Sequence, residues 1–184
     1  MIKDLALKNR SYRRFHQDVP IEHETMRELV DLVRLCASAA NRQALKYIIS
    51  SDPIKNALIF PHIRIDNNPV EGERPSAYII VLEDTRIGSV MQYVDCGITA
   101  QTILLGAVEK GFGGCMVGNV LRDDLRKALN IPSHLEILLV IALGKPKEEM
   151  IIEAIGEDGF MQQWWDEKGT RHLYKRALDD IIVE

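Results

Sequence analysis

Residues 95–118, DCGITAQTILLGAVEKGFGGCMVG, decide the fold. They contain most of a predicted helix, about Met91 to Lys110, in which apolar and small side chains surround the axis. A helix with so little polar face is usually buried in the middle of a fold or at a subunit interface. Glycines then flank a predicted short strand, Cys115–Val117. A dinucleotide-binding glycine loop follows a strand and opens a helix, and this run does the reverse. It therefore predicts a tight turn, or a close approach of bare backbone to a ring.

The rest of the chain alternates predicted helices and strands. Helices are expected at Met1–Lys8, Glu22–Ala37 and Val120–Leu129, and strands at Lys46–Ser50, Tyr78–Glu83 and Glu136–Leu143. The helix at Glu22–Ala37 has one apolar face and should pack on a core with that face only. Asn119 is placed to cap the start of the helix at Val120–Leu129. The strand at Glu136–Leu143 is apolar enough to lie at the centre of a sheet. Proline, asparagine and glycine between the first two strands predict an irregular stretch. We expect an α+β fold in one domain, residues 1–184, with a C-terminal extension from about residue 145.

Composition excludes several classes of protein. The 184 residues are 46% hydrophobic and 27% charged, which excludes disorder, and 27 acidic against 23 basic residues disfavour nucleic-acid binding. Three widely spaced cysteines, Cys36, Cys96 and Cys115, argue against a disulfide framework or structural zinc site and favour a reducing cytoplasm. The longest apolar run, Ile137–Leu143, is far shorter than the ~20 residues that span a bilayer. We expect a cytoplasmic protein with no nucleic-acid or membrane partner.

Two segments have the composition of ligand-binding sites. Asn9–Phe15 holds three arginines within five residues, and guanidinium groups pair well with phosphate oxygens, although a solvated basic turn is the commoner outcome. Ser38–Gln43 combines small residues, which admit a flat ligand, with side chains that can hydrogen-bond a ring edge. An ordinary helix-ending loop is an equally good interpretation of this second segment.

No catalytic side chain can be named. The five histidines lack the spacing of metal ligands, and neither a serine-hydrolase nor a zinc-protease motif occurs. Cys115 has apolar neighbours in sequence and is expected to be buried and inert. An enzyme with this sequence would therefore depend on a cofactor for its chemistry.

Together these segments resemble the FMN-dependent nitroreductase family over most of the chain. Asn9–Phe15 resembles the family's opening Arg-x-Ser-x-Arg-x-Phe signature, and Ala37–Gln43 resembles its Pro-Ser-x-x-Asn-x-Gln-Pro-Trp segment. Asp95–Gly118 is similar to the long central helix and its glycine-rich exit. Ala142–Pro146 and Lys175–Ile182 resemble the end of the last strand and the C-terminal Lys-Arg-x-Leu-x-x-Ile signature.

The resemblance implies a central, mostly antiparallel sheet flanked by helices, in an intertwined homodimer with two FMN sites at the interface. The long apolar helix and the C-terminal extension, which would reach the partner subunit, agree with a dimer. The resemblance implies that Arg10, Ser11 and Arg13 bind the phosphate, the ribityl chain or the pyrimidine edge of the ring. The other subunit would contribute Ser38, Ala39 and Asn41, with Gln43 beside them. Val117 and Gly118 would lie along the ring, and Lys175 or Arg176 would contact the phosphate. No metal is implied.

The sequence departs from the family pattern at several points. Asn9 replaces the first arginine of the opening signature, and Ala44 and Leu45 replace Pro-Trp after Gln43. The chain is also short for the family. These departures leave open which acceptor fits the pocket and whether Trp164 and Trp165 touch it or belong to a core.

The resemblance implies an oxidoreductase in which NADH or NADPH reduces FMN and leaves, after which a nitroaromatic, quinone or similar small molecule is reduced in a ping-pong cycle. The flavin would carry the chemistry, so no catalytic side chain is required. A flavin-binding module without turnover, a sensor or carrier, is the alternative. A weaker one is a relative that dehydrogenates a bound substrate or fragments flavin.

Overall fold

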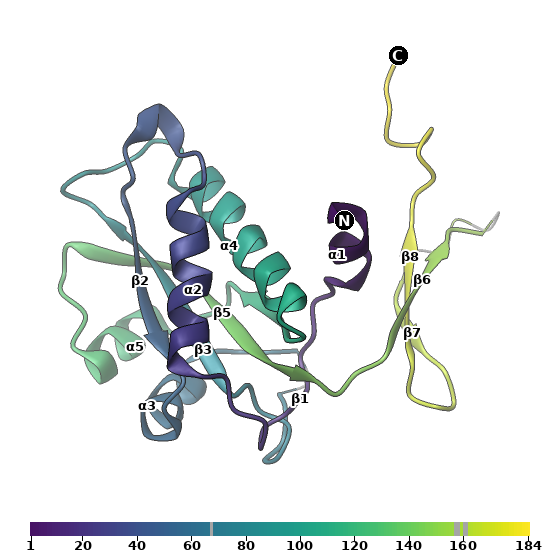
Figure 1. Cartoon of the computed structure of the whole chain (residues 1–184), viewed down its shortest axis with the longest axis horizontal. Coiled ribbons are helices and arrows are strands. Elements are labelled where there is room, and N and C mark those ends of the chain that lie inside the picture. The colour runs from purple at the N-terminus through teal and green to yellow at the C-terminus, as the bar shows by residue number, and fades with distance from the viewer. Residues whose placement is uncertain (67, 157–158, 160–161) are drawn as a thin grey trace. The chain divides into compact units, whose positions relative to one another are not determined.

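The computed structural model describes residues 1–66, 68–156, 159 and 162–184. It consists of two compact units, Met1–Pro146 and Lys147–Glu184 (Figure 1). The division lies close to residue 145, where the C-terminal extension is expected to begin. That this extension reaches a partner subunit stays a prediction.

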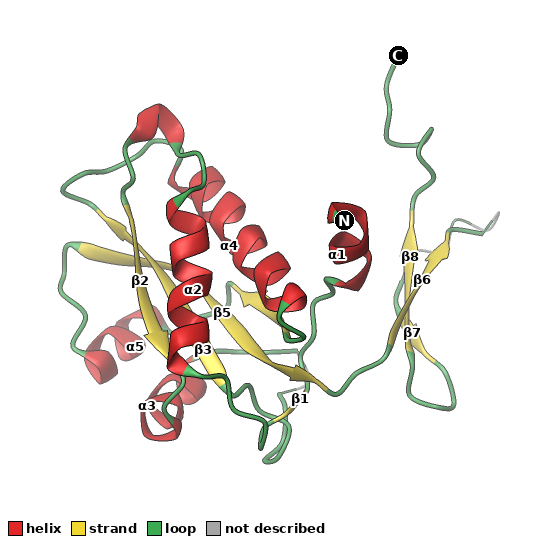
Figure 2. Cartoon of the chain, in the orientation of Figure 1, coloured by secondary structure: helices red, strands yellow, loops and turns green. Residues whose placement is uncertain are grey.

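The first unit is an antiparallel sheet covered by helices (Figure 2). Its strands are β1 (Phe15–His16), β2 (Leu45–Ser50), β3 (Ala77–Asp84), β4 (Gly113–Val117) and β5 (Leu135–Pro146). Its helices are α1 (Ile2–Lys8), α2 (His23–Arg34), α3 (Pro53–Ile59), α4 (Gln92–Glu109) and α5 (Arg122–Leu129), with short 3-10 turns η1 (Ala39–Asn41) and η2 (Phe60–His62). The predicted α+β fold with an antiparallel sheet is therefore confirmed.

Strand β5 is the centre of this sheet. Residues 140–143 of β5 pair with both β3 and β4, so these two strands lie on its opposite edges, and β1 pairs with its end at Lys145 and Pro146. Strands β3 and β4 both run antiparallel to β5, with Ile79 opposite Ile141 and Cys115 opposite Ala142. The apolar sequence of β5 predicts this central position correctly, because a strand with neighbouring strands on both edges and helices on both faces is shielded from water.

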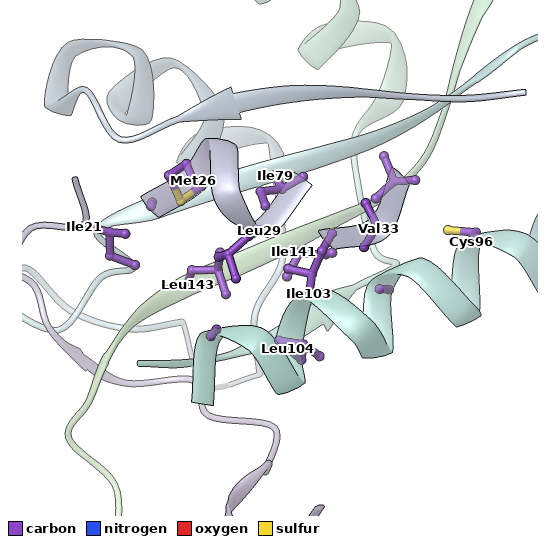
Figure 3. Packing of buried hydrophobic residues seen from close by; sticks show 14 of the residues in the cluster. Ile21, Met26, Leu29, Val33, Ile79, Cys96, Ile103, Leu104, Ile141 and Leu143 are labelled. Carbon is purple, nitrogen blue, oxygen red and sulfur yellow. The ribbon is translucent and has the colours of Figure 1, made fainter. Parts of the chain in front are cut away.

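Two hydrophobic clusters cover the faces of the sheet. On one face, α2 and α4 pack over β3 and β5, as Figure 3 shows for Met26, Leu29 and Val33 of α2 and Ile103 and Leu104 of α4. On the other face, α3, α5 and the segments beside them bury apolar side chains, among them Ile59 and Leu125. The one-sided apolar pattern of α2 is thus explained, although the helix ends at Arg34 rather than Ala37.

Two local predictions are wrong. The stretch between β2 and β3 is not wholly irregular, because it contains α3 and η2. The carboxylate of Asp52 accepts hydrogen bonds from the amides of Ile54 and Lys55, both at 3.2 Å, and Pro53 occupies the first helical position, where it needs no donor. Asn119 does not cap α5, which begins at Arg122; its backbone carbonyl accepts from the Arg64 amide at 2.9 Å instead.

The second unit is a small three-stranded sheet of β6 (Met150–Ala154), β7 (Trp164–Trp165) and β8 (Arg171–Lys175). Strand β8 is central, parallel to β6 and antiparallel to β7. The Trp164 ring stacks on the buried His172 ring with centroids 4.0 Å apart, and Glu153 lies 2.9 Å from His172 Nδ1. Both tryptophans are partly exposed, so they do not form a closed core.

Among the helices of the described residues, none is long and apolar enough to cross a membrane.

Candidate functional site

The basic N-terminal segment is fastened to strand β4. Ser11 forms a parallel bridge with Gly114, and the Tyr12 amide donates to the Gly114 carbonyl at 3.1 Å. Gly114 also lies close to β5 because it has no side chain: a Cβ there would lie 2.3 Å from the Ala142 carbonyl oxygen. A Cβ on Gly113 would lie 2.6 Å from the Tyr12 ring. The space beside these two glycines is therefore occupied by other parts of the protein rather than by a ligand ring.

The three arginines of this segment have different partners. Arg13 donates to the Ser11 carbonyl at 3.1 Å and pairs with Asp66 at 3.2 Å. Arg10 donates to carbonyls in the last turn of α1, and Arg14 pairs with Glu73. Because Asp66 is 72% exposed, its pair with Arg13 is worth at most about 1 kcal/mol, and a phosphate could replace it. Arg13 is thus the arginine best placed for an anion beside Ser11.

Bare backbone is available where β4 ends. A Cβ on Gly118 would meet no atom within 4 Å, so this glycine faces open space. The Val117 side chain is buried in the core, which leaves its main chain for any ligand. Arg122, which the sequence did not single out, donates to the Leu138 carbonyl at 2.9 Å and to the Gly118 carbonyl at 3.4 Å. It therefore fixes the exit of β4 against β5.

The second predicted segment is a strained loop. Ala40, Asn41 and Gln43 have φ of 49°, 53° and 52°, in the left-handed region. This conformation costs roughly 1–2 kcal/mol for an ordinary residue, somewhat less for asparagine. Strain of this kind is typical of ligand-binding and catalytic sites. The Gln43 amide donates to Ser38 Oγ at 3.1 Å, and the Gln43 side chain donates to Asn41 Oδ1 at 3.0 Å.

Asp95 ties this loop to α4. Its Oδ1 accepts a hydrogen bond from the Ala39 amide at 2.9 Å, and the side chain is buried, with 3% exposed. A cavity of about 500 Å³ lies beside the loop, between α2, β2 and the start of α4. Ser38, Tyr47 and Thr99 line it together with Asp95, and burial raises the pKa of the Tyr47 hydroxyl.

The two segments lie on opposite flanks of α4. Ala39 is bonded to Asp95, whereas Leu104 touches the position that a Cβ on Gly114 would take, beside Ser11. Asp95 and Leu104 are two and a half helical turns apart, which separates them by about 14 Å along the axis and places them on opposite sides. Within one chain, α4 therefore stands between the segments.

The side of α4 between these flanks is apolar and exposed. Tyr93, Val94 and Ile98 are exposed along it, and Met116 of β4 is exposed as well. We call these four residues the α4 ridge. Exposed apolar side chains grouped in this way are typical of an interface.

Comparisons with known proteins point to one family. Residues 73–145 match the model of the nitroreductase family. An Archaeoglobus fulgidus protein that carries the name NADH dehydrogenase/NAD(P)H nitroreductase is 27% identical over 148 residues, which are 74% of this chain and 80% of that protein. In sequence the chain is therefore similar to the nitroreductase family. It is accordingly an oxidoreductase enzyme, as its sequence resemblance predicts.

Solved structures of the nitroreductase family share the fold. A family member from Streptococcus pneumoniae TIGR4 matches 100% of both chains, with a TM-score of 0.75 at 16% identity. An FMN-dependent nitroreductase from Clostridium difficile R20291 matches 81% of this chain and 89% of its own length, with a TM-score of 0.66 at 23% identity. The roles that the family resemblance gives to individual residues stay predictions. Among them, Lys175 and Arg176 are exposed at the end of β8, in the second unit.

Proposed function

We propose that this protein is a member of the nitroreductase family that binds FMN and uses NADH or NADPH to reduce nitroaromatic, quinone or similar small molecules. The observation that carries the proposal is the bridge from Ser11 to β4, with Arg13 bonded to the Ser11 carbonyl, on the strand that leads to the bare backbone of Gly118. The match to the family model and the names of the relatives support it.

The residues along β4 suit FMN. Ser11 lies beside Gly114, and Val117 follows three residues further on, about 10 Å along the strand. A cation and a hydroxyl are therefore available at one end and open main chain at the other, as a ligand with a phosphate and a flat ring requires. A monophosphate fits better than the pyrophosphate of FAD, because the sequence has no strand-to-helix glycine loop.

Each residue would contribute binding or orientation. Arg13 would exchange Asp66 for the phosphate, and Ser11 would bond the ribityl chain or ring edge. The main chain at Val117 and Gly118 would lie along the ring, held in place by Arg122. When bound, FMN supplies the redox chemistry, taking hydride from the nicotinamide and passing two electrons to the acceptor in a ping-pong cycle.

We also propose that the site is shared by two chains in a homodimer. The α4 ridge is the surface on which a second copy would pack, and packing there would place the partner's Ser38–Gln43 loop near this chain's β4. The C-terminal segment carries exposed Leu178, Ile181 and Ile182, which suit a partner surface, and Lys175 or Arg176 would reach the phosphate. The three free cysteines favour a reducing compartment such as the cytoplasm.

The test is the absorption spectrum of the purified protein, followed by extraction of its cofactor and anaerobic titration with NADH and with NADPH. We expect FMN, loss of the visible flavin band with one of the two donors, and recovery when a quinone or nitroaromatic is added. Extraction of FAD, or a colourless protein that does not bind added FMN, would refute the assignment of FMN as the cofactor. Bound FMN that neither donor reduces would instead identify a flavin-binding module without turnover.

A further inference from the structure

We propose that Asp95 is a positioning residue of the flavin site, which holds the strained Ser38–Gln43 loop in the conformation that contacts the cofactor. The inference rests on the proposed function, because the loop's role in flavin binding does. It adds a residue that neither the family signatures quoted above nor the sequence pattern assigns to the site.

Asp95 is placed to hold the loop. It lies in the first turn of α4, a helix fixed in the core by side chains such as Cys96 and Ile103. Its Oδ1 accepts the Ala39 amide at 2.9 Å, immediately before the left-handed residues Ala40 and Asn41. The anchor is therefore a hydrogen bond from a rigid element to the start of the strained turn.

The loop needs an anchor of this kind. Several other hydrogen bonds, among them Gln43 to Ser38, Gln43 to Asn41 and the Asn41 amide to the Ser38 carbonyl, lie within the loop and cannot fix it to the body of the protein. Arg42 adds weaker contacts of 3.3 and 3.5 Å to the carbonyls of Ile87 and Gly88. Left-handed backbone at non-glycine residues persists only where the surroundings impose it. Asp95 imposes it from α4.

The first experiment measures FMN affinity and, without flavin, amide hydrogen exchange. In Asp95→Ala we expect about 10- to 100-fold weaker FMN binding and faster exchange of the amides at 39–43. Asp95→Asn keeps an oxygen at the acceptor position and should stay close to the wild type in both. Asp52→Ala is the control, because Asp52 also accepts backbone amides, those of Ile54 and Lys55 at 3.2 Å, but at the start of α3. It should lower the melting temperature while leaving FMN affinity unchanged.

The second experiment separates loop conformation from general stability. Glycine adopts left-handed backbone without strain, so Ala40→Gly in the Asp95→Ala background should restore most of the lost FMN affinity. Ala37→Gly is its control, because Ala37 is not left-handed, and it should restore nothing. All titrations are made well below the melting temperature of the weakest variant.

The outcomes distinguish this inference from the proposed function. If the wild type does not bind FMN, the proposed function fails. Hydrogen exchange still tests the anchor in that case: amides at 39–43 that exchange equally fast in the wild type and Asp95→Ala would refute it. If the wild type binds FMN and Asp95→Ala binds it equally well, only the positioning role is overturned. Equal rescue by Ala40→Gly and Ala37→Gly would overturn it too.

Discussion

At the scale of single residues, the site is built from groups that already have protein partners. The side chain of Arg13 is 24% exposed, and its guanidinium contacts both Asp66 and the Ser11 carbonyl. An arginine held in this way is oriented before a ligand arrives, so little side-chain entropy is lost on binding. The exposed partner Asp66 is the group that an anion would displace.

Replacing Arg13 with alanine should weaken FMN binding about 10- to 150-fold, because it removes a charge-assisted contact worth about 1.5–3 kcal/mol. Arg10→Ala should also weaken binding, but through the loss of its bonds to the end of α1. Titration of flavin fluorescence measures both. The control is Arg14→Ala, whose partner is Glu73, and FMN affinity should not change there. Equal FMN affinity in the wild type and Arg13→Ala would leave this arginine without a role in binding.

Asp84, at the end of β3, gives a pH-dependent prediction. Hydrogen bonds from the Arg86 side chain, at 2.9 and 2.7 Å, lower the pKa of Asp84 to about 2, against an opposing effect of burial. A lowered pKa in the folded state stabilises the protein above the unfolded-state pKa of about 3.9, and this stabilisation is lost as the pH falls through about 2. The melting temperatures of the wild type and Asp84→Asn should therefore converge between about pH 4 and pH 2. A difference that stays constant over this range would contradict the assignment.

At the scale of elements, β4 is the part of the fold that the cofactor site requires most directly. It is held between β5 on one side and the bridge from Ser11 on the other, and both contacts depend on bare backbone. The sequence places glycines there, but only the structure shows that Gly113 and Gly114 lie within the strand. The left-handed turn that precedes it is made by Gly111, with φ of 79°.

Gly114→Ala should lower the free energy of unfolding by about 1–3 kcal/mol, because the new Cβ would overlap the Ala142 carbonyl and force β4 away from β5. Gly118→Ala is the matched control, since its Cβ would enter open space and its φ is not left-handed. We expect that variant to stay within about 0.5 kcal/mol of the wild type. Urea unfolding measures both, and a Gly114→Ala protein as stable as the wild type would show that β4 is not clamped here.

Elements whose signal is local could be predicted from the sequence. The apolar strand β5, the one-sided helix α2 and the long helix α4 each follow from a continuous pattern of side chains. Helix α3 was missed because its neighbours are rich in turn-forming residues, although Asp52-Pro53 marks its start. Asp95 and Arg122 could not be found, because their partners lie far away in the sequence, at Ala39 and at Ile137 and Leu138. Left-handed backbone at Ala40 is equally invisible, since no residue type requires it.

At the scale of the whole molecule, the central claim is that one cofactor site needs two chains. Helix α4 separates the Ser38–Gln43 loop from β4 within a chain, and the α4 ridge is exposed between them. A two-fold packing of two ridges would place each loop beside the other chain's β4. Dimerisation and flavin binding would then be linked, so that added FMN should stabilise the dimer.

Subunit mixing tests this claim most directly. An Arg13→Ala chain and an Asn41→Gly chain carry different affinity tags and are purified together as a heterodimer. Glycine removes the Asn41 side chain without straining its left-handed backbone. If sites are shared, the heterodimer has one doubly damaged site and one intact site, and it should bind about one FMN per dimer with wild-type affinity while both parent homodimers bind weakly. A heterodimer that binds FMN as poorly as its parents, or a wild-type monomer in sedimentation that is fully occupied by FMN, would contradict the shared site.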